Sequence, residues 1–283
     1  AQTMSSDTFE VIFVDNGSSD DSIALMQEHG RGLRNLKILS YTEQQGSYAA
    51  RNFGVGHAEA DLFVFADADC IPVPEWLAEI ARIAKTLSGV FLIVGDVRLF
   101  PRGRDFNCYE LYDKRAFLNQ RQYAEQQTGA TANLTVSRMG FESVGGFPEV
   151  FSGGDRVFSS WVMATDGAQF VFSEVAAVFH PARSTKAEIV KKVVRLGRGN
   201  ATLHYKPGQP AANLRFLTVQ IIGFILLPHQ WRMSIGMFRE YGLTDARAWA
   251  FLPMTLRFGW VQRLFLIARF IALMRGRTHL RDE

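Results

Sequence analysis

The sequence is poor in cysteine. Among its 283 residues it holds only Cys70 and Cys108, whose spacing forms no pairing pattern. A fold held together by disulfides is therefore excluded, and a reducing compartment is expected. We expect both cysteines to pack as small apolar side chains rather than to act as reactive thiols.

Long apolar runs are missing as well. The uncharged stretch at 216–228 has 13 residues, whereas a helix needs about 20 to cross a bilayer. The first residues, AQTMSSDTFE, are polar and lack the apolar core of a signal peptide. The sequence thus predicts no signal peptide and no spanning helix, and its length suits one large domain or a domain with an appendage.

Negative charge is scarce near the C-terminus. Residues 1–199 carry 20 Lys and Arg against 24 Asp and Glu, whereas residues 200–283 carry 11 against 4. The overall charge of +3 therefore combines a slightly acidic body with a basic tail. Such a tail indicates a membrane surface, a phosphate-rich partner or nucleic acid, and a solvated basic face is the alternative.

Short apolar runs alternate with helical patterns in the first part of the chain. Strands are expected at 10–15, 36–41, 61–69 and 90–100, and helices at 22–29, 48–60 and 74–87. This alternation predicts an α/β domain with a largely parallel sheet. The later patterns predict helices over 105–127 and 156–167, a strand at 130–137, a glycine-rich loop at 140–155, two short strands at 170–173 and 176–181, and a helix over 186–196 that ends in GRGN.

Carboxylates stand at the ends of two predicted strands. Asp15 follows one apolar run, and Asp67 and Asp69 follow another. Residues two apart on a strand point to the same face, so Asp67 and Asp69 can reach one ligand. Their charges repel unless a cation neutralises them, and a hard divalent ion bridging to a diphosphate would do so. A strand-end turn with two solvated aspartates is the alternative.

Further short motifs follow in a fixed order. They are DNGS at 15–18, GSYAARN at 46–52, DAD at 67–69, VGGFPE at 144–149, SGGD at 152–155 and HP at 180–181. In this order and spacing the set resembles the inverting family 2 glycosyltransferases of the GT-A fold, over about residues 9–200. The resemblance implies a mixed, mainly parallel sheet with flanking helices over 1–200. A basic, apolar helical tail over 201–283 would follow.

The resemblance also implies a donor site. Asp15, Arg51 and Asp67 would contact the nucleotide of the donor. Asp69, together with Asp67 and His180, would ligate Mn²⁺ or Mg²⁺ at the diphosphate. A histidine that is simply hydrogen-bonded at a strand end is the alternative reading of His180.

Other residues match the family pattern less fully. Asp155 occupies the place of the catalytic base, although the usual Glu-Asp pair is Gly-Asp here. Arg195 and Arg198 fall where the family often binds phosphate, and a solvated helix end is the alternative. Asn133, on a predicted strand, is a candidate contact for the donor sugar.

The start of the chain departs from the family. Members begin with a strand and a helix that precede the segment equivalent to EVIFVD, whereas this sequence starts after them. The expected difference is on the order of 30 residues. We therefore expect either a fragment of a longer protein or an incomplete donor site.

The tail combines tryptophan with arginine. Trp231, Trp249 and Trp260 lie among recurring arginines, and both residue types suit a membrane interface. We expect peripheral attachment at the inner, cytoplasmic face of the cell membrane. A helical appendage packed on the catalytic domain or on a second subunit is the alternative.

Together these features predict a metal-dependent inverting glycosyltransferase. It would move a sugar from a nucleotide-diphosphate donor to a saccharide or lipid-linked acceptor in cell-surface glycan synthesis, with no nucleic acid partner. One alternative is a nucleotidyltransferase that makes nucleotide sugars, which typically carries a glycine-rich basic loop after its first strand. The other is a non-catalytic, membrane-associated module that binds nucleotide sugars.

Overall fold

The computed structural model describes residues 2–150, 152–226, 234–236, 238–239, 242 and 244–276. The chain forms two compact units. The first comprises Ala1–Arg98, Asn119–Glu149 and Gly154–His180, and the second comprises Leu99–Leu118, Val150–Gly153 and Pro181–Glu283.

The first unit is built on strands. β1 (Val11–Asp15) pairs in parallel with β2 (Leu36–Ser40). A five-stranded sheet has the order β3-β6-β5-β7-β4, formed by β3 (Leu62–Ala66), β4 (Ile71–Pro72), β5 (Phe91–Phe100), β6 (Asn133–Ser137) and β7 (Gln169–Pro181).

The predicted mixed sheet is present, with more antiparallel pairing than the sequence indicated. β6 pairs antiparallel with both β3 and β5, and β4 pairs antiparallel with β7. β3 and β5 therefore run in the same direction, as the alternation of strands and helices predicts. The later strand β6 lies between them, so they do not pair with each other.

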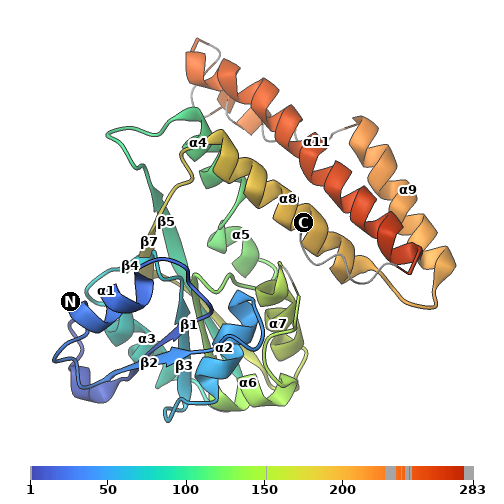
Figure 1. Cartoon of the computed structure of the whole chain (residues 1–283). Coiled ribbons are helices and arrows are strands. Elements are labelled where there is room, and N and C mark those ends of the chain that lie inside the picture. The colour runs from blue at the N-terminus through green and yellow to red at the C-terminus, as the bar shows by residue number, and fades with distance from the viewer. Residues whose placement is uncertain are drawn as a thin grey trace. The chain divides into compact units, whose positions relative to one another are not determined.

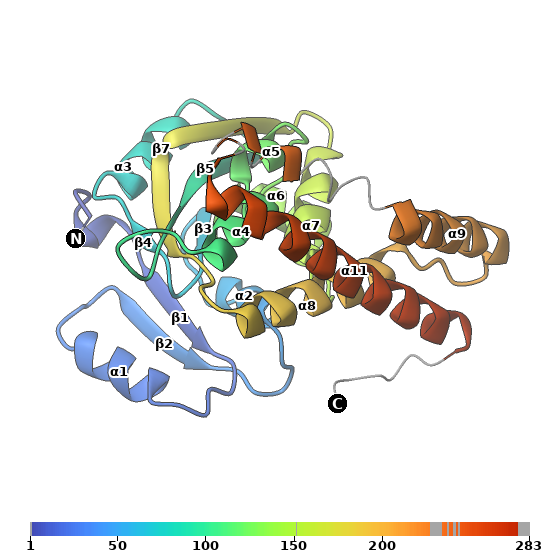
Figure 2. The same cartoon turned by 90° about the horizontal axis from the view of Figure 1, so that it is seen from above.

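Helices pack on both faces of this sheet. The described helices of this unit are α1 (Ser22–His29), α2 (Ser47–Val55), α3 (Trp76–Ala84), α5 (Gln120–Ala124), α6 (Arg138–Val144) and α7 (Gly154–Met163), after a short 3₁₀ turn at Ser6–Thr8. Of these, α2 packs against β1 of the two-stranded sheet. Figure 2 shows α3 on one side of the sheet and α6 with α7 on the other. Leu134 and Val136 in β6 are fully buried, as apolar residues two apart on a packed strand face should be.

Three local predictions for this unit need correction. α2 ends at Val55 rather than continuing to residue 60. The predicted glycine-rich loop contains α6, which begins because the Ser137 side chain accepts a hydrogen bond from the Gly140 amide, and which ends at Gly145 in the left-handed conformation. The two predicted strands near 170 and 178 are one strand, β7, that continues through the exposed Glu174 and Val175.

The second unit is helical. It contains α4 (Cys108–Ala116), α8 (Lys186–His204), α9 (Pro210–Leu226) and α11 (Ala246–Met274). α11 packs against both α8 and α9, and Figure 1 shows the three helices side by side. A main part of its core consists of Leu111, Tyr112, Phe117, Ile189, Val193, Phe251, Met254 and Phe258.

Glycines inside α8 explain why this helix does not end at GRGN as predicted. A Cβ atom at Gly197 would collide with the Gln262 carbonyl of α11, and one at Gly199 would lie 2.7 Å from the Ser152 Cβ. These glycines therefore permit close approach of neighbouring backbone while the helix continues to His204. Among the helices of the described residues, none is long and apolar enough to cross a membrane.

Candidate functional site

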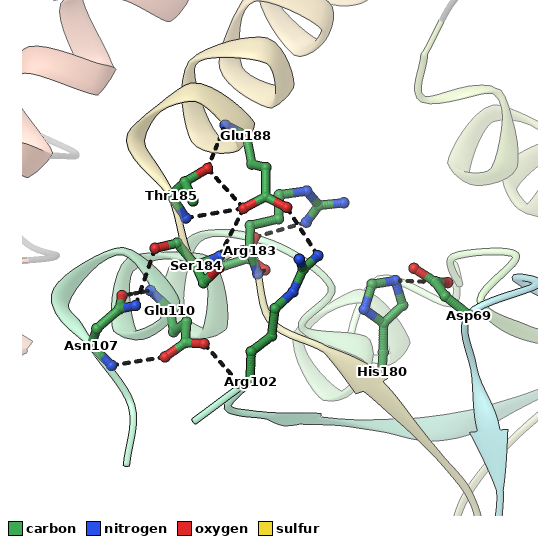
Figure 3. Close-up of polar contacts among 10 residues, drawn as sticks. Asp69, Arg102, Asn107, Glu110, His180, Arg183, Ser184, Thr185 and Glu188 are labelled. Atoms are coloured by element: carbon green, nitrogen blue, oxygen red, sulfur yellow. Dashed lines mark hydrogen bonds and ion pairs between the residues drawn. The ribbon is translucent and has the colours of Figure 1, made fainter. Parts of the chain in front are cut away.

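Two aspartates and a histidine meet where β3 ends. β3 stops at Ala66, and Asp67 and Asp69 lie in the following turn, which the Cys70 amide closes with a hydrogen bond of 3.0 Å to the Asp67 carbonyl. The turn, rather than the pleat of a strand as predicted, brings the two carboxylates together. His180, near the end of β7, points toward Asp69, with 3.4 Å between Nε2 and Oδ1 (Figure 3).

The three side chains form a ligand set suited to a divalent cation. One carboxylate oxygen of each aspartate and one ring nitrogen of His180 all lie within 4.8 Å of one another. Ligands about 2.1 Å from one Mg²⁺ lie at most about 4.2 Å apart, so small side-chain rotations would bring all three onto one ion. His180 is buried and Asp69 is exposed, so the group faces solvent on one side only.

Arg51 is the charged neighbour of this group. It projects from α2, and its Nη2 lies 2.6 Å from Asp67 Oδ1. Both side chains are partly exposed. Burial, followed by the nearby Asp67 carboxylate, raises the pKa of Cys70 to about 12, so this thiol stays neutral beside the aspartates.

Asp15 ends β1 and is buried. Its carboxylate accepts hydrogen bonds from the Gly17 amide at 3.1 Å and from the Ser18 amide at 3.3 Å. Hydrogen bonds from Ser18 and Gly17 hold the pKa of Asp15 below its usual range. The next residue, Asn16, binds the loop before α2, donating to Tyr41 and Gln44 carbonyls and accepting from the Gly46 amide.

Asn52 on α2 connects two of the predicted motifs. Its side-chain amide donates to the Phe147 carbonyl and its Oδ1 accepts from the Phe147 amide, both at 2.9 Å. Gly146 has a φ of +94°, and a Cβ atom there would lie 2.9 Å from Asn52 Oδ1. The Ala-Arg-Asn helix and the Val-Gly-Gly-Phe loop are therefore held together by hydrogen bonds that require glycine at 146.

Asp155 lies in the first turn of α7, which begins at Gly154. Asp155 therefore lies inside the helix and not at the N-cap position that precedes it. One carboxylate oxygen lies 3.2 Å from the Tyr48 hydroxyl, and the other accepts a long hydrogen bond of 3.4 Å from the Thr131 amide. Sequence reasoning missed Tyr48, although its position one turn before Arg51 places both side chains on one face of α2.

Asn133 pairs with Ala66 at the end of β3. It is buried, its Oδ1 accepts from Trp76 Nε1 at 3.0 Å, and its Nδ2 donates to the carbonyls of Asp96 and Ala176. A Cβ atom at Gly95 would occupy the space of this amide. Both polar atoms of its side chain are therefore hydrogen-bonded within the first unit, and its contact with the donor sugar stays a prediction.

Arg195 and Arg198 belong to the second unit, on α8. The Arg198 guanidinium lies 5.5 Å from the centre of the Phe265 ring, over its face. Within the second unit, an ion pair holds the segment that follows His180 in the sequence. Arg183 pairs with the fully buried Asp113, with its Nη1 2.8 Å from Oδ1 and its amide 2.9 Å from Oδ2.

Two interlocked helix caps adjoin this segment, as Figure 3 shows. Asn107 caps α4 and Thr185 caps α8, and in each case a glutamate, Glu110 or Glu188, bonds back to the cap amide. Asn107 also donates to the Ser184 carbonyl at 3.1 Å. The N-termini of α4 and α8 are therefore bound to each other.

Comparison with known proteins supports a single family. The model of glycosyl transferase family 2 matches residues 1–144. Glycosyltransferase AglE of Haloferax volcanii is 36% identical over 205 residues, covering 70% of this chain and 65% of its own length. The pre-mycofactocin glycosyltransferase of Mycobacterium tuberculosis is 24% identical over 236 residues, covering 80% of this chain and 47% of its own length.

These matches extend over about half to two thirds of the relatives' own length. Among solved structures, the mannosyltransferase PcManGT of Pyrobaculum calidifontis, in complex with GDP-Man and Mn²⁺, has a TM-score of 0.54 at 18% identity. The match covers 98% of this chain and 81% of that chain. This likeness confirms the predicted fold class, a mixed sheet with flanking helices and a helical C-terminal region.

Proposed function

The chain belongs to glycosyl transferase family 2, and we propose that it moves a sugar from a nucleotide-diphosphate donor to an acceptor hydroxyl with inversion at the anomeric carbon. The observation that carries this proposal is the convergence of Asp67, Asp69 and His180 within 4.8 Å, with Arg51 beside Asp67. The residues present fit a divalent cation, because two carboxylates and an imidazole are ligands that Mn²⁺ and Mg²⁺ accept.

Each group has a distinct task in this reaction. Asp67, Asp69 and His180 would hold the cation, which supplies positive charge for the departing diphosphate when bound. Asp15 and Arg51 would orient the nucleotide. Asp155 would accept the proton of the acceptor hydroxyl as the new bond to the anomeric carbon forms and the bond to the diphosphate breaks.

Donor binding tests this proposal. We expect UDP- or GDP-linked sugars to raise the melting temperature of the chain in Mn²⁺ and not in EDTA, and one of them to be hydrolysed or transferred to an added acceptor. Synthesis of a nucleotide sugar from a nucleoside triphosphate and a sugar phosphate would instead identify a nucleotidyltransferase. Binding without any turnover would identify a non-catalytic module.

We also infer that the helical tail contacts the inner face of the cell membrane, where a lipid-linked acceptor for a surface glycan would be met. Leu214, Ile221, Ile222 and Ile225 are exposed on α9 and fall on one face at helical spacing. Trp260 and Leu264 are likewise exposed on α11, and neither helix contains an acidic residue. Trp231, the third predicted membrane residue, lies outside the described residues.

Replacing two of these isoleucines by glutamate should weaken the binding of the chain to membranes. We expect Ile222→Glu with Ile225→Glu to reduce flotation with anionic vesicles at least about tenfold, because each buried aliphatic side chain contributes about 1.5–3 kcal/mol. Leu25→Glu, at an exposed apolar position on α1, is the control and should float like the unchanged chain. Equal flotation of all three proteins would refute the membrane contact.

A further inference from the structure

Tyr48 and Arg51 lie one turn apart on α2 and contact two different carboxylates. The Tyr48 hydroxyl lies 3.2 Å from Asp155 Oδ1, and Arg51 Nη2 lies 2.6 Å from Asp67 Oδ1. The guanidinium of Arg51 also lies 5.9 Å from the centre of the Tyr48 ring. One helical turn therefore touches both the aspartate proposed as base and an aspartate of the cation group.

The environment of Tyr48 fixes its hydroxyl as a hydrogen-bond donor. The side chain is 8% exposed, and its ring stacks on Phe147 with 5.7 Å between centroids. Burial, and secondarily the charge of Asp155, raises the pKa of Tyr48, so the hydroxyl keeps its proton at physiological pH. Asp155, which has no proton to give when ionised, is then the acceptor.

The other recorded hydrogen bonds to the Asp155 carboxylate come from backbone amides. The uncharged Thr131 amide donates a long hydrogen bond, of 3.4 Å, to Asp155 Oδ2. Arg156 donates its own amide to Asp155, but its guanidinium is directed elsewhere, to Gln126 Oε1 at 2.9 Å and over the Tyr123 ring. Tyr48 is thus the ionisable side chain that the structure records in a hydrogen bond with the Asp155 carboxylate.

We propose that Tyr48 is a positioning residue for sugar transfer, which orients the Asp155 carboxylate while Arg51 holds Asp67 from the same helix. This inference rests on the proposed function in one respect, the role of Asp155 as proton acceptor. A hydrogen bond donated to a carboxylate restricts its rotation. A fixed orientation serves a group that must accept a proton from a bound hydroxyl.

The variant Tyr48→Phe tests the inference because it keeps the ring against Phe147 and removes only the hydroxyl. We expect kcat to fall about tenfold or more, the usual effect of losing a hydrogen bond to a charged group. The KM for the donor should stay within about twofold, since the cation group is untouched.

Two further variants separate this role from packing and from failure of the proposed function. Phe147→Leu disturbs the ring contact but keeps the hydroxyl, so it should lower the melting temperature with a smaller loss of kcat than Tyr48→Phe causes. In an Asp155→Asn background, Tyr48→Phe should cause no additional loss of kcat. If Asp155→Asn retains turnover, the proposed base is wrong. If it abolishes turnover while Tyr48→Phe leaves kcat unchanged, the inference about Tyr48 is overturned.

Discussion

Replacing Asp155 by asparagine is expected to lower the turnover of sugar transfer by at least about 100-fold, since general-base catalysis contributes about 10²–10⁴-fold. Asparagine keeps the shape of the side chain but cannot accept the proton of the acceptor hydroxyl. A negative charge in the first turn of α7 is worth only about 0.3–1 kcal/mol of stability. The melting temperature should therefore change little while kcat, measured with saturating donor and acceptor, collapses.

Donor affinity provides the internal check for Asp155→Asn. It should survive, because the carboxylates at the end of β3 are unchanged. Asp166→Asn removes an exposed carboxylate just after α7 and is the matched control, for which kcat should equal that of the unchanged chain. Transfer by Asp155→Asn within a few-fold of the unchanged chain would mean that the proton acceptor lies elsewhere.

Replacing Asp69 by alanine should abolish the dependence of donor binding on a divalent cation. The variant leaves His180 with Asp67, whose oxygen is already 2.6 Å from Arg51. Removal of a direct ligand should cost more than the roughly 10–100-fold loss of metal affinity that follows removal of an outer partner. Calorimetric titration with UDP or GDP in Mn²⁺ and in EDTA measures this loss.

The control for Asp69→Ala comes from the other end of the same strand. Asp61 precedes β3, and its side chain is 98% exposed and 3.5 Å from the Arg138 guanidinium. Asp61→Ala should bind the nucleotide in Mn²⁺ as the unchanged chain does. If the unchanged chain binds equally well in EDTA and in Mn²⁺, the cation is not part of the donor site.

Local chemistry allowed much of the fold to be predicted from the sequence. α1 begins and ends at the predicted residues, because Ser22 follows a polar turn and Gly30 follows His29. The family resemblance carried by the order of short motifs also placed Asp67, Asp69 and His180 in one group, and these side chains do lie together.

Contacts between distant segments account for what the sequence did not predict. Glycine often marks the end of a helix, but Gly197 lies inside α8. Its missing side chain lets the backbone of α11 pack closely against α8. Asn133 has the polarity of a ligand contact, but carbonyls of two other strands use its amide. The contact of Tyr48 could not be predicted, because its partner, Asp155, lies 107 residues further along the chain.

Helix α2 has only nine residues, yet it carries Tyr48, Arg51 and Asn52, and these bind Asp155, Asp67 and the Phe147 backbone respectively. Short surface helices are often among the first parts of a domain to open and close in native-state fluctuations. If α2 frays, the three contacts are lost in the same event, so the two halves of the site lose their order together rather than one at a time. The local opening free energy of this one helix therefore sets an upper limit on the fraction of molecules in which the whole site is assembled.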